Sequence, residues 1–360
     1  MAHSRAYLAV GLMSGTSMDG IDAALLRTDG EDLAVPLAAR SFPYPSDVRI
    51  RLEALVRNAA RNPAERAAVE EVLTELHARA VHGLLAETGL PRPDLAGFHG
   101  HTVLHRPAEG RSLQIGDGPH LARRLGCPVV WDFRSADLAA GGEGAPLAPI
   151  YHACVTRGLE RPLAVLNVGG VANLTWIGEG GQLLAFDTGP GNAPIDDWSA
   201  RHLGRPCDED GRLAAAGRVD DERLEAALGH PFFDRPPPKS LDRQDFPVSL
   251  VEGLAPADGA ATLTALAAAA VARARRWLPA PPRRWLVTGG GRRNPVLMAM
   301  LAARLEAPVT AIEAVGADGD ALEAQCFAYL AVRVLRGLPT SFPTTTGART
   351  PVCGGRIARP

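Results

Sequence analysis

A glycine-rich loop near the start of the chain carries groups that could bind a phosphate chain. It consists of Gly15, Thr16, Ser17, Met18, Asp19, Gly20, Ile21 and Asp22. Backbone N–H groups, two hydroxyls and a carboxylate can hold phosphate oxygens together with Mg²⁺, because this ion takes one or two carboxylates and keeps water ligands. Asp19, through a water molecule, or Asp22 would serve as that carboxylate. The alternative for the loop taken alone is an ordinary hairpin turn, in which Gly, Ser and Asp are common.

A second polar loop, with Asn167, Gly169 and Gly170, has the same layout as the first. It separates the apolar stretches 162–166 and 171–177, as the first loop separates 7–13 and 21–28. Two strand–loop–strand units of this kind predict two similar halves and a second phosphate loop.

A third loop, Gly289-Gly290-Gly291, joins the apolar stretch 284–288 to a predicted helix over 295–305. Glycine has no side chain, so a flat ring or a ribose could approach this backbone closely. Its position after both phosphate loops favours a contact with adenosine, and we assign Asn294 to the nucleotide with it. A purely structural turn is the alternative.

Asp187 has the type and position of a general base. It follows the predicted strand 182–186 and precedes the rigid turn of the sequence FDTGPGN, so it could take a proton from a hydroxyl or from water. An Asx turn that only stabilises the loop is the alternative. Gly189 lies in the same turn and is assigned to the substrate, whereas Asp196 and Asp197 begin a predicted helix.

Polar residues also follow the short predicted strands 95–98 and 128–131. They are His99, His101 and His105 after the first strand and Asp132 and Arg134 after the second. Ligands of open α/β sheets bind where strands end, so this region is a substrate-site candidate. We disfavour a metal site, because no cysteine or carboxylate completes a ligand set around the histidines. Arg134 could clamp a substrate, although a solvated surface role is the default for an arginine.

The composition excludes several classes of function. The chain has 360 residues, 46% of them apolar, which is enough for two domains, and its net charge of -2 disfavours nucleic acid as a partner. The apolar stretch 263–272 is too short to span a bilayer and predicts a buried helix. The five cysteines stand singly and no signal peptide is apparent, so we expect a cytoplasmic protein. Lys239 is the single lysine and lies outside any Walker-type loop.

Taken in order, these motifs resemble the anhydro-N-acetylmuramic acid kinase family, within the superfamily of actin, hexokinase and the chaperone ATPases. The resemblance rests on GLMSGTSMDGID, FHGHTVLH, LQIGDG, DFRSADLAAGGEGAPLAP, NVGGVANLT, FDTGPGN, PPPKS, TGGGRRNPVLM and DALEAQCFAYLA. It implies an α/β fold of two ribonuclease-H-like domains with a nucleotide cleft between them. The N-terminal domain would comprise residues 1–132 and 340–360, and the C-terminal domain residues 133–339.

The resemblance also implies a reaction that uses ATP and Mg²⁺. Water opens the 1,6-anhydro ring of 1,6-anhydro-N-acetylmuramic acid, and the freed 6-oxygen takes the γ-phosphate, with Asp187 as the base that activates the water. The implied sugar-side residues are His99, Thr102, Asp132, Arg134, Asp187, Gly189 and Glu323. The resemblance further implies a small-molecule substrate and a homodimer, without a nucleic-acid or membrane partner.

Two alternatives remain at this point, a related kinase that phosphorylates a free sugar hydroxyl and a nucleotide-driven binding protein. Two departures from the family pattern concern the sugar contacts. The chain has His101 where the family commonly has Gln, and Leu241-Asp242 where it commonly has Thr-Gly.

Overall fold

The computed structural model describes residues 5–15, 18–57 and 63–360, and the chain divides into two compact units. Unit 1 comprises Met1–Val155 and Ala321–Pro360, and unit 2 comprises Thr156–Asp320. Residues 133–155 and 321–339, which the sequence assigned to the C-terminal domain, therefore belong to unit 1. The reason is tertiary, since the helix over 322–335 packs against the sheet of unit 1.

The sheet of unit 1 is mixed. Its strands are β1 (Tyr7–Ser14), β2 (Gly20–Thr28), β3 (Ala34–Pro43), β4 (Leu95–Arg106), β5 (Arg111–Ile115), β6 (Val129–Trp131) and β12 (Arg356–Ala358). In the described residues the strand order is β12-β6-β4-β1-β2-β3, with β5 paired to β4. Strands β1, β2 and β3 form an antiparallel meander, while β4 is parallel to β1 and β6 is parallel to β4.

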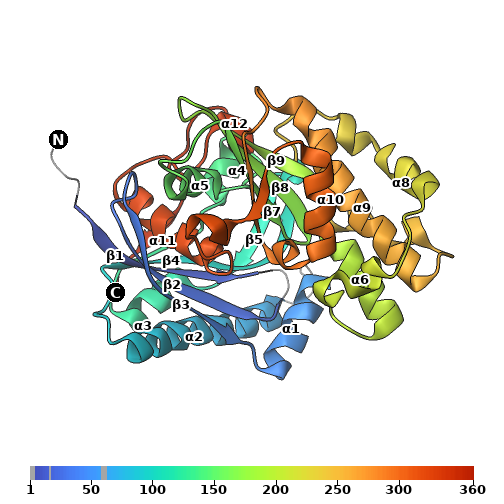
Figure 1. The fold of residues 1–360 in the computed structure, drawn as a ribbon. Helices are drawn as coiled ribbons and strands as arrows, with labels where there is room; N and C mark the ends of the chain where they lie inside the picture. Colours follow the sequence, from blue (N-terminus) through green and yellow to red (C-terminus); the bar gives the residue numbers. More distant parts are fainter. Residues whose placement is uncertain (1–4, 16–17, 58–62) are drawn as a thin grey trace. The chain divides into compact units, whose positions relative to one another are not determined.

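Helices cover both faces of this sheet. The helices of unit 1 are α1 (Ser46–Arg57), α2 (Pro63–Thr88), α3 (Gly118–Leu125), α4 (Ser135–Ala139), α5 (Pro149–Val155), α11 (Leu322–Leu335) and α12 (Pro343–Thr346). Val10 and Leu12 of β1 point into the core beneath α1 and α2, which lie along one face in Figure 1. Gly11 points to the other face, where a methyl group would lie 1.7 Å from the Ala324 carbonyl oxygen. Only a glycine lets α11 approach β1 this closely.

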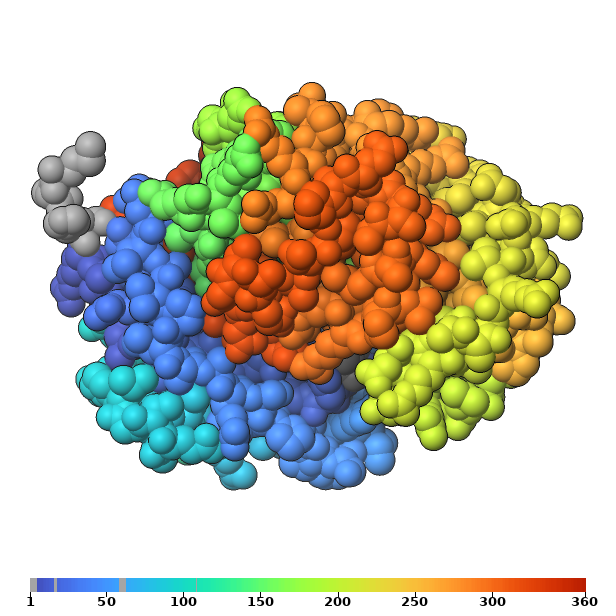
Figure 2. Space-filling model, viewed as in Figure 1, coloured from blue at the N-terminus to red at the C-terminus, as the bar shows by residue number. Residues whose placement is uncertain are grey.

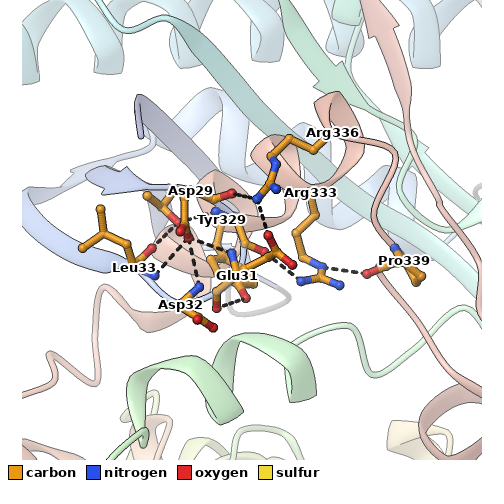
Figure 3. Close-up of polar contacts among 10 residues, drawn as sticks. Asp29, Glu31, Asp32, Leu33, Tyr329, Arg333, Arg336 and Pro339 are labelled. Carbon is orange, nitrogen blue, oxygen red and sulfur yellow. Dashed lines mark hydrogen bonds and ion pairs between the residues drawn. The ribbon is translucent and has the colours of Figure 1, made fainter. Parts of the chain in front are cut away.

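Polar contacts hold the C-terminal half of α11 to the turn between β2 and β3 (Figure 3). The Arg333 guanidinium donates to the Gly30 carbonyl at 2.7 Å, and the Tyr329 hydroxyl donates to the Glu31 carbonyl at 2.9 Å. Arg336 forms an ion pair with Glu31 at 2.7 Å. Arg333 and Tyr329 are buried, so their two hydrogen bonds are shielded from water and set the orientation of the helix.

Unit 2 contains a second mixed sheet. Its strands are β7 (Leu163–Val168), β8 (Val171–Ile177), β9 (Leu183–Pro190), β10 (Trp285–Thr288) and β11 (Val309–Ala311), in the order β11-β10-β7-β8-β9. Strands β7, β8 and β9 form an antiparallel meander, β10 is parallel to β7, and β11 is parallel to β10. In unit 1, the strands β6, β4, β1, β2 and β3 lie in the same order as β11, β10, β7, β8 and β9 and run in the same relative directions. Both units therefore have a ribonuclease-H-like topology, and the expected duplication is confirmed.

The helices of unit 2 are α6 (Ala193–Leu203), α7 (Arg212–Ala215), α8 (Asp221–Leu228), α9 (Pro256–Ala274) and α10 (Pro295–Leu305). The predicted buried helix over 263–272 is part of α9, in which most alanines and Leu266 are buried. In Figure 2, α10 and the segment after it (orange) form the visible surface in this part of unit 2. None of the described helices is long and apolar enough to cross a membrane.

Two predicted strands are longer in the structure than the sequence indicated. Strand β4 continues to Arg106, so His99, His101 and Thr102 lie within it and not after it. Strand β9 continues to Pro190, so Asp187 also lies within a strand. Each extension has a pairing partner that local composition does not reveal: β5 pairs with the end of β4, and Val171 of β8 pairs with Pro190.

Candidate functional site

The first phosphate loop lies between β1 and β2. Met18 N donates to the Gly15 carbonyl at 3.1 Å, and the Asp19 carbonyl accepts from Tyr44 N at 3.0 Å. Asp19 is exposed, whereas Gly20, Ile21 and part of Asp22 are covered by the strands. Thr16 and Ser17 lie outside the described residues. The loop is thus anchored at both ends and keeps one carboxylate toward solvent.

A buried hydrogen-bonded chain supports the start of this loop. Ser14 Oγ lies 2.8 Å from His101 Nδ1 and accepts a hydrogen bond from the Tyr44 hydroxyl at 2.7 Å. A register shift between β1 and β4 brings Ser14 opposite His101. Burial lowers the pKa of His101 to about 4 and raises the pKa of Tyr44 above its usual range. Both groups are neutral at pH 7, and they act through geometry and not through charge.

Unit 1 also brings together most of the predicted sugar-side residues. Arg134 donates to His99 Nε2, with Nη2 at 2.9 Å, and to the Gly144 carbonyl at 2.6 Å. Burial lowers the pKa of Arg134 to about 10, and the nearby Glu323 carboxylate opposes that shift. Burial and the Arg134 charge lower the pKa of His99 well below its usual range. His99 is therefore neutral and orients an arginine that remains charged.

A cavity of about 170 Å³ lies beside this cluster within unit 1. His99, Asp132, Gln114 and Trp131 are among its lining residues. Thr102 does not line it but accepts from Gln114 Nε2 at 3.1 Å. Asp132 has a φ of 53°, a strained conformation for a residue with a side chain, and accepts a hydrogen bond from Ser135. The cavity offers the aromatic face and hydrogen-bonding groups that a sugar ring requires.

In unit 2, polar residues form one row across four strands. Thr288 of β10 pairs with Asn167 of β7, Asn167 pairs with Asn173 of β8, and Asn173 pairs with Asp187 of β9. Directly paired residues point to the same face of a sheet. A register shift next to Thr188 places Asp187 opposite Asn173, as bulges near functional sites often do. The row links the second phosphate loop to the predicted base.

The second phosphate loop and the glycine loop are also in contact. Gly289 has a φ of 75°, and a methyl group on it would lie 2.4 Å from Asn167 Oδ1. The Gly169 carbonyl accepts from Asn192 N at 2.7 Å. Arg292, whose side chain is only 5% exposed, donates to the Gly289 carbonyl at 3.0 Å and pairs with Glu313 and Asp320. Backbone groups of three loops thus meet at one end of the sheet.

Asp187 is held on both its backbone and its side chain. Its N–H donates to the Lys239 carbonyl at 3.0 Å, and its Oδ2 accepts from Leu241 N at 2.9 Å. Gly189, predicted to touch substrate, lies against Ala270 of α9 and the Phe233 ring.

The side-chain oxygen of Asn294 caps α10 by accepting from Val296 N and Leu297 N, at 3.0 and 3.1 Å. Asn294 positions the helix after the glycine loop, and a nucleotide contact for Asn294 stays a prediction.

Two residues that the sequence did not single out join this region. Asn173 completes the polar row, and Asn192 Nδ2 donates to the Val168 carbonyl at 3.0 Å. Both lie inside quoted motifs, and only the strand pairing distinguishes them from their neighbours.

Asp196 is a further carboxyl group close to the second phosphate loop. It lies in the first turn of α6, and the first residue of that helix, Ala193, donates to the Gly170 carbonyl at 3.1 Å. Burial raises the pKa of Asp196 to about 7, opposed by Arg243. The sequence predicted that Asp196 lies at the start of a helix. That role accounts for the position of Asp196 but not for its burial.

The backbone groups of these loops can bind phosphates. The Asp187 carboxylate can act as a base two strands away from Asn167, a separation of about 10 Å. In the described residues no three His, Cys, Asp or Glu side chains cluster to hold a metal ion. Asp19 and Asp22, both close to Tyr44, are the carboxylates that the sequence proposed for a divalent ion.

Comparisons with known proteins agree over nearly the whole chain. A family model described as anhydro-N-acetylmuramic acid kinase matches residues 7–360. The chain is 56% identical to the anhydro-N-acetylmuramic acid kinase of Paramagnetospirillum magneticum, over 97% of this chain and 99% of that one. It is 58% identical to that of Rhodospirillum rubrum, over 97% and 94%. Component A of (R)-2-hydroxyglutaryl-CoA dehydratase from Acidaminococcus fermentans is a similar solved structure, with 13% identity, a TM-score of 0.48, and coverage of 90% and 98%.

Proposed function

The chain belongs to the anhydro-N-acetylmuramic acid kinase family, and from that premise we propose how its residues divide the reaction between them. The family's kinase reaction uses ATP and a small sugar substrate. Water opens the 1,6-anhydro ring of 1,6-anhydro-N-acetylmuramic acid, and the 6-oxygen is phosphorylated, giving N-acetylmuramic acid 6-phosphate and ADP in peptidoglycan recycling. The alternative of a kinase for a free sugar hydroxyl is not favoured, because the relatives carry the anhydro-sugar activity in their names.

Asp187 takes a proton from the water that attacks the anomeric carbon. As the new C1–O bond forms, the bond from C1 to the 6-oxygen breaks, and the 6-oxygen attacks the γ-phosphorus and expels ADP. The observation that carries this proposal is the polar row, which puts a carboxylate and the phosphate loop on one face, about 10 Å apart. That separation leaves room for one sugar ring between a base and a phosphoryl group.

The backbone of both phosphate loops and the glycine loop binds ATP, and Mg²⁺ neutralises phosphate charge when bound. Asp19 holds this ion through water, a role that its exposed position fits. His99, Thr102, Asp132, Arg134 and Glu323 contact the sugar. Arg134 is suited to the lactyl carboxylate of the substrate, because a buried guanidinium binds a carboxylate strongly. The homodimer and the cytoplasmic location rest on the family resemblance and on the composition.

Turnover in ¹⁸O-labelled water tests the reaction directly. The purified protein is incubated with ATP, Mg²⁺ and the anhydro-sugar, and the product is read by mass spectrometry before the anomeric oxygen exchanges. We expect a 6-phosphate with one ¹⁸O at the anomeric position. Phosphorylation of reducing sugars alone, or ADP without a sugar product, would contradict the proposal.

Replacing Asp19 by Ala is expected to raise the Mg²⁺ concentration needed for half-maximal turnover by about tenfold, because a water-mediated carboxylate contributes about 1–2 kcal/mol. A magnesium titration of the steady-state rate measures this. Asp47→Ala, which removes an exposed carboxylate of α1, is the control. Identical titration curves for the Asp19 variant and the unaltered protein would remove Asp19 from the metal site.

Replacing Gly289 by Ala is expected to raise KM for ATP at least about tenfold, since the backbone would be strained and the loop displaced from Asn167. Gly253→Ala is a matched control for backbone strain, because Gly253 has a φ of 85° and its methyl group would meet no atom within 4 Å. Steady-state kinetics with ATP varied compare the two. A KM for ATP in the Gly289 variant equal to that of the unaltered protein would show that the loop does not bind the nucleotide.

A further inference from the structure

Lys239 is the only lysine of the chain, and its side chain is buried. Its Nζ donates to the carbonyl oxygens of Phe232 at 3.1 Å and Phe233 at 3.4 Å. The Phe232 ring centre lies 4.4 Å from Nζ, and the Trp277 ring is also near. A buried cation is costly unless such groups compensate it, so this site is specific for a long cationic side chain.

Burial, together with Arg276 and Arg235, lowers the pKa of Lys239 to about 8, while Asp234 and Asp187 oppose the shift. The amine therefore stays mostly protonated at neutral pH. Its own hydrogen bonds are to carbonyl oxygens, so it is an anchor and does not itself transfer a proton.

The backbone next to this anchor is what holds Asp187. Strand β9 is the edge of its sheet in the described part of unit 2, so no further strand binds the outward N–H of Asp187. The Lys239 carbonyl accepts that N–H, and Leu241 N donates to the Asp187 carboxylate. The segment 239–241 thus takes the place of a neighbouring strand for this one residue.

We propose that Lys239 is a positioning residue for Asp187: its anchored side chain fixes the segment 239–241 against β9 and so orients the carboxylate. This inference rests on the proposed role of Asp187 as the base. It accounts for a lysine that is buried and donates its hydrogen bonds to the backbone carbonyls of Phe232 and Phe233.

Lys239→Met tests the inference, because Met has a similar length, suits the aromatic surroundings and removes the cost of a buried charge. We expect kcat to fall about 10- to 100-fold, with KM for ATP changed less than about twofold, since small displacements of a catalytic group are this costly. Lys239→Gln, which keeps a donor for the carbonyls, is expected to give an intermediate kcat. Arg276→Met is the matched control, since Arg276 donates to the same Phe233 carbonyl and to the exposed Asp234 carboxylate; its kcat should stay unchanged.

Thermal unfolding of each variant and the double variant Asp187→Asn/Lys239→Met complete the test. If Lys239 acts through Asp187, the double variant has the same residual rate as Asp187→Asn alone. A further multiplicative loss, an unchanged kcat in Lys239→Met, or equal losses in Lys239→Met and Arg276→Met would overturn the inference. Full activity of Asp187→Asn would instead refute the base assignment itself, so the two failures are distinguishable.

Discussion

Asp187→Asn is expected to lower kcat for the anhydro-sugar by about 10³-fold or more, within the range that a general base contributes. The amide cannot accept the proton of the attacking water. It can still accept the hydrogen bond from Leu241 N, now 2.9 Å from Oδ2, so the strand and the segment beside it are expected to remain in place. Steady-state kinetics give kcat, and equilibrium binding gives the affinity for ATP, which we expect to be unchanged.

Asp197→Asn is the matched control for this variant. Asp197 is an exposed aspartate of α6 that pairs with Arg243 at 2.8 Å, and its loss is expected to leave kcat unchanged. Loss of ATP binding together with activity in Asp187→Asn would make Asp187 a structural residue. Full turnover in that variant would require another base.

Unit 1 is expected to lose stability steeply as the pH falls below about 6.5, because it contains buried neutral histidines. Burial lowers the pKa of His77, His101 and His152 to about 4 each, from an ordinary value of 6.5. The unfolded chain then binds protons before the folded chain does, so stability is complete above pH 6.5 and is lost as pH falls toward 4. At pH 5 each group contributes a loss of about 2 kcal/mol, about 6 kcal/mol together.

Urea unfolding at pH 7.5 and pH 5, with hydrogen exchange to locate the unfolding segments, measures this loss. His101→Gln removes one of the buried titrating groups and is expected to reduce the loss by about 2 kcal/mol. His82→Gln, on the exposed side of α2, is the control and is expected to leave it unchanged. The same free energy of unfolding at both pH values would contradict the burial of these rings in neutral form.

Much of the secondary structure could be predicted from local patterns. The helix over 295–305 and the strand over 171–177 have the predicted bounds, because an apolar period and its flanking Gly or Pro lie within the same short segment. The duplicated layout was also apparent, since each half carries its own pair of apolar stretches around a small polar loop. Strand β3 was not predicted, because much of it is exposed and its sequence has no clear alternation.

Some residues of the candidate site could likewise be found from the local sequence, and others only from the fold. Loop residues such as Gly15, Asn167 and Gly289 were found because glycine and short polar side chains between apolar stretches are informative by themselves. Asn173 was not, because it becomes part of the site only through its pairing with Asn167 and Asp187. The position of Lys239 beside Asp187 was equally hidden, since the two residues are 52 positions apart in the chain.

The sequence by itself therefore determined the types of groups available, the elements that carry them and the family to which they belong. Only the tertiary structure decided that α11 covers the sheet of unit 1, that a register shift turns Asp187 toward Asn173, and that the segment after Lys239 holds the carboxylate. Each of these depends on contacts between segments far apart in the chain. Such contacts are selected by packing and by hydrogen bonding of the folded molecule, which no local pattern of residue types encodes.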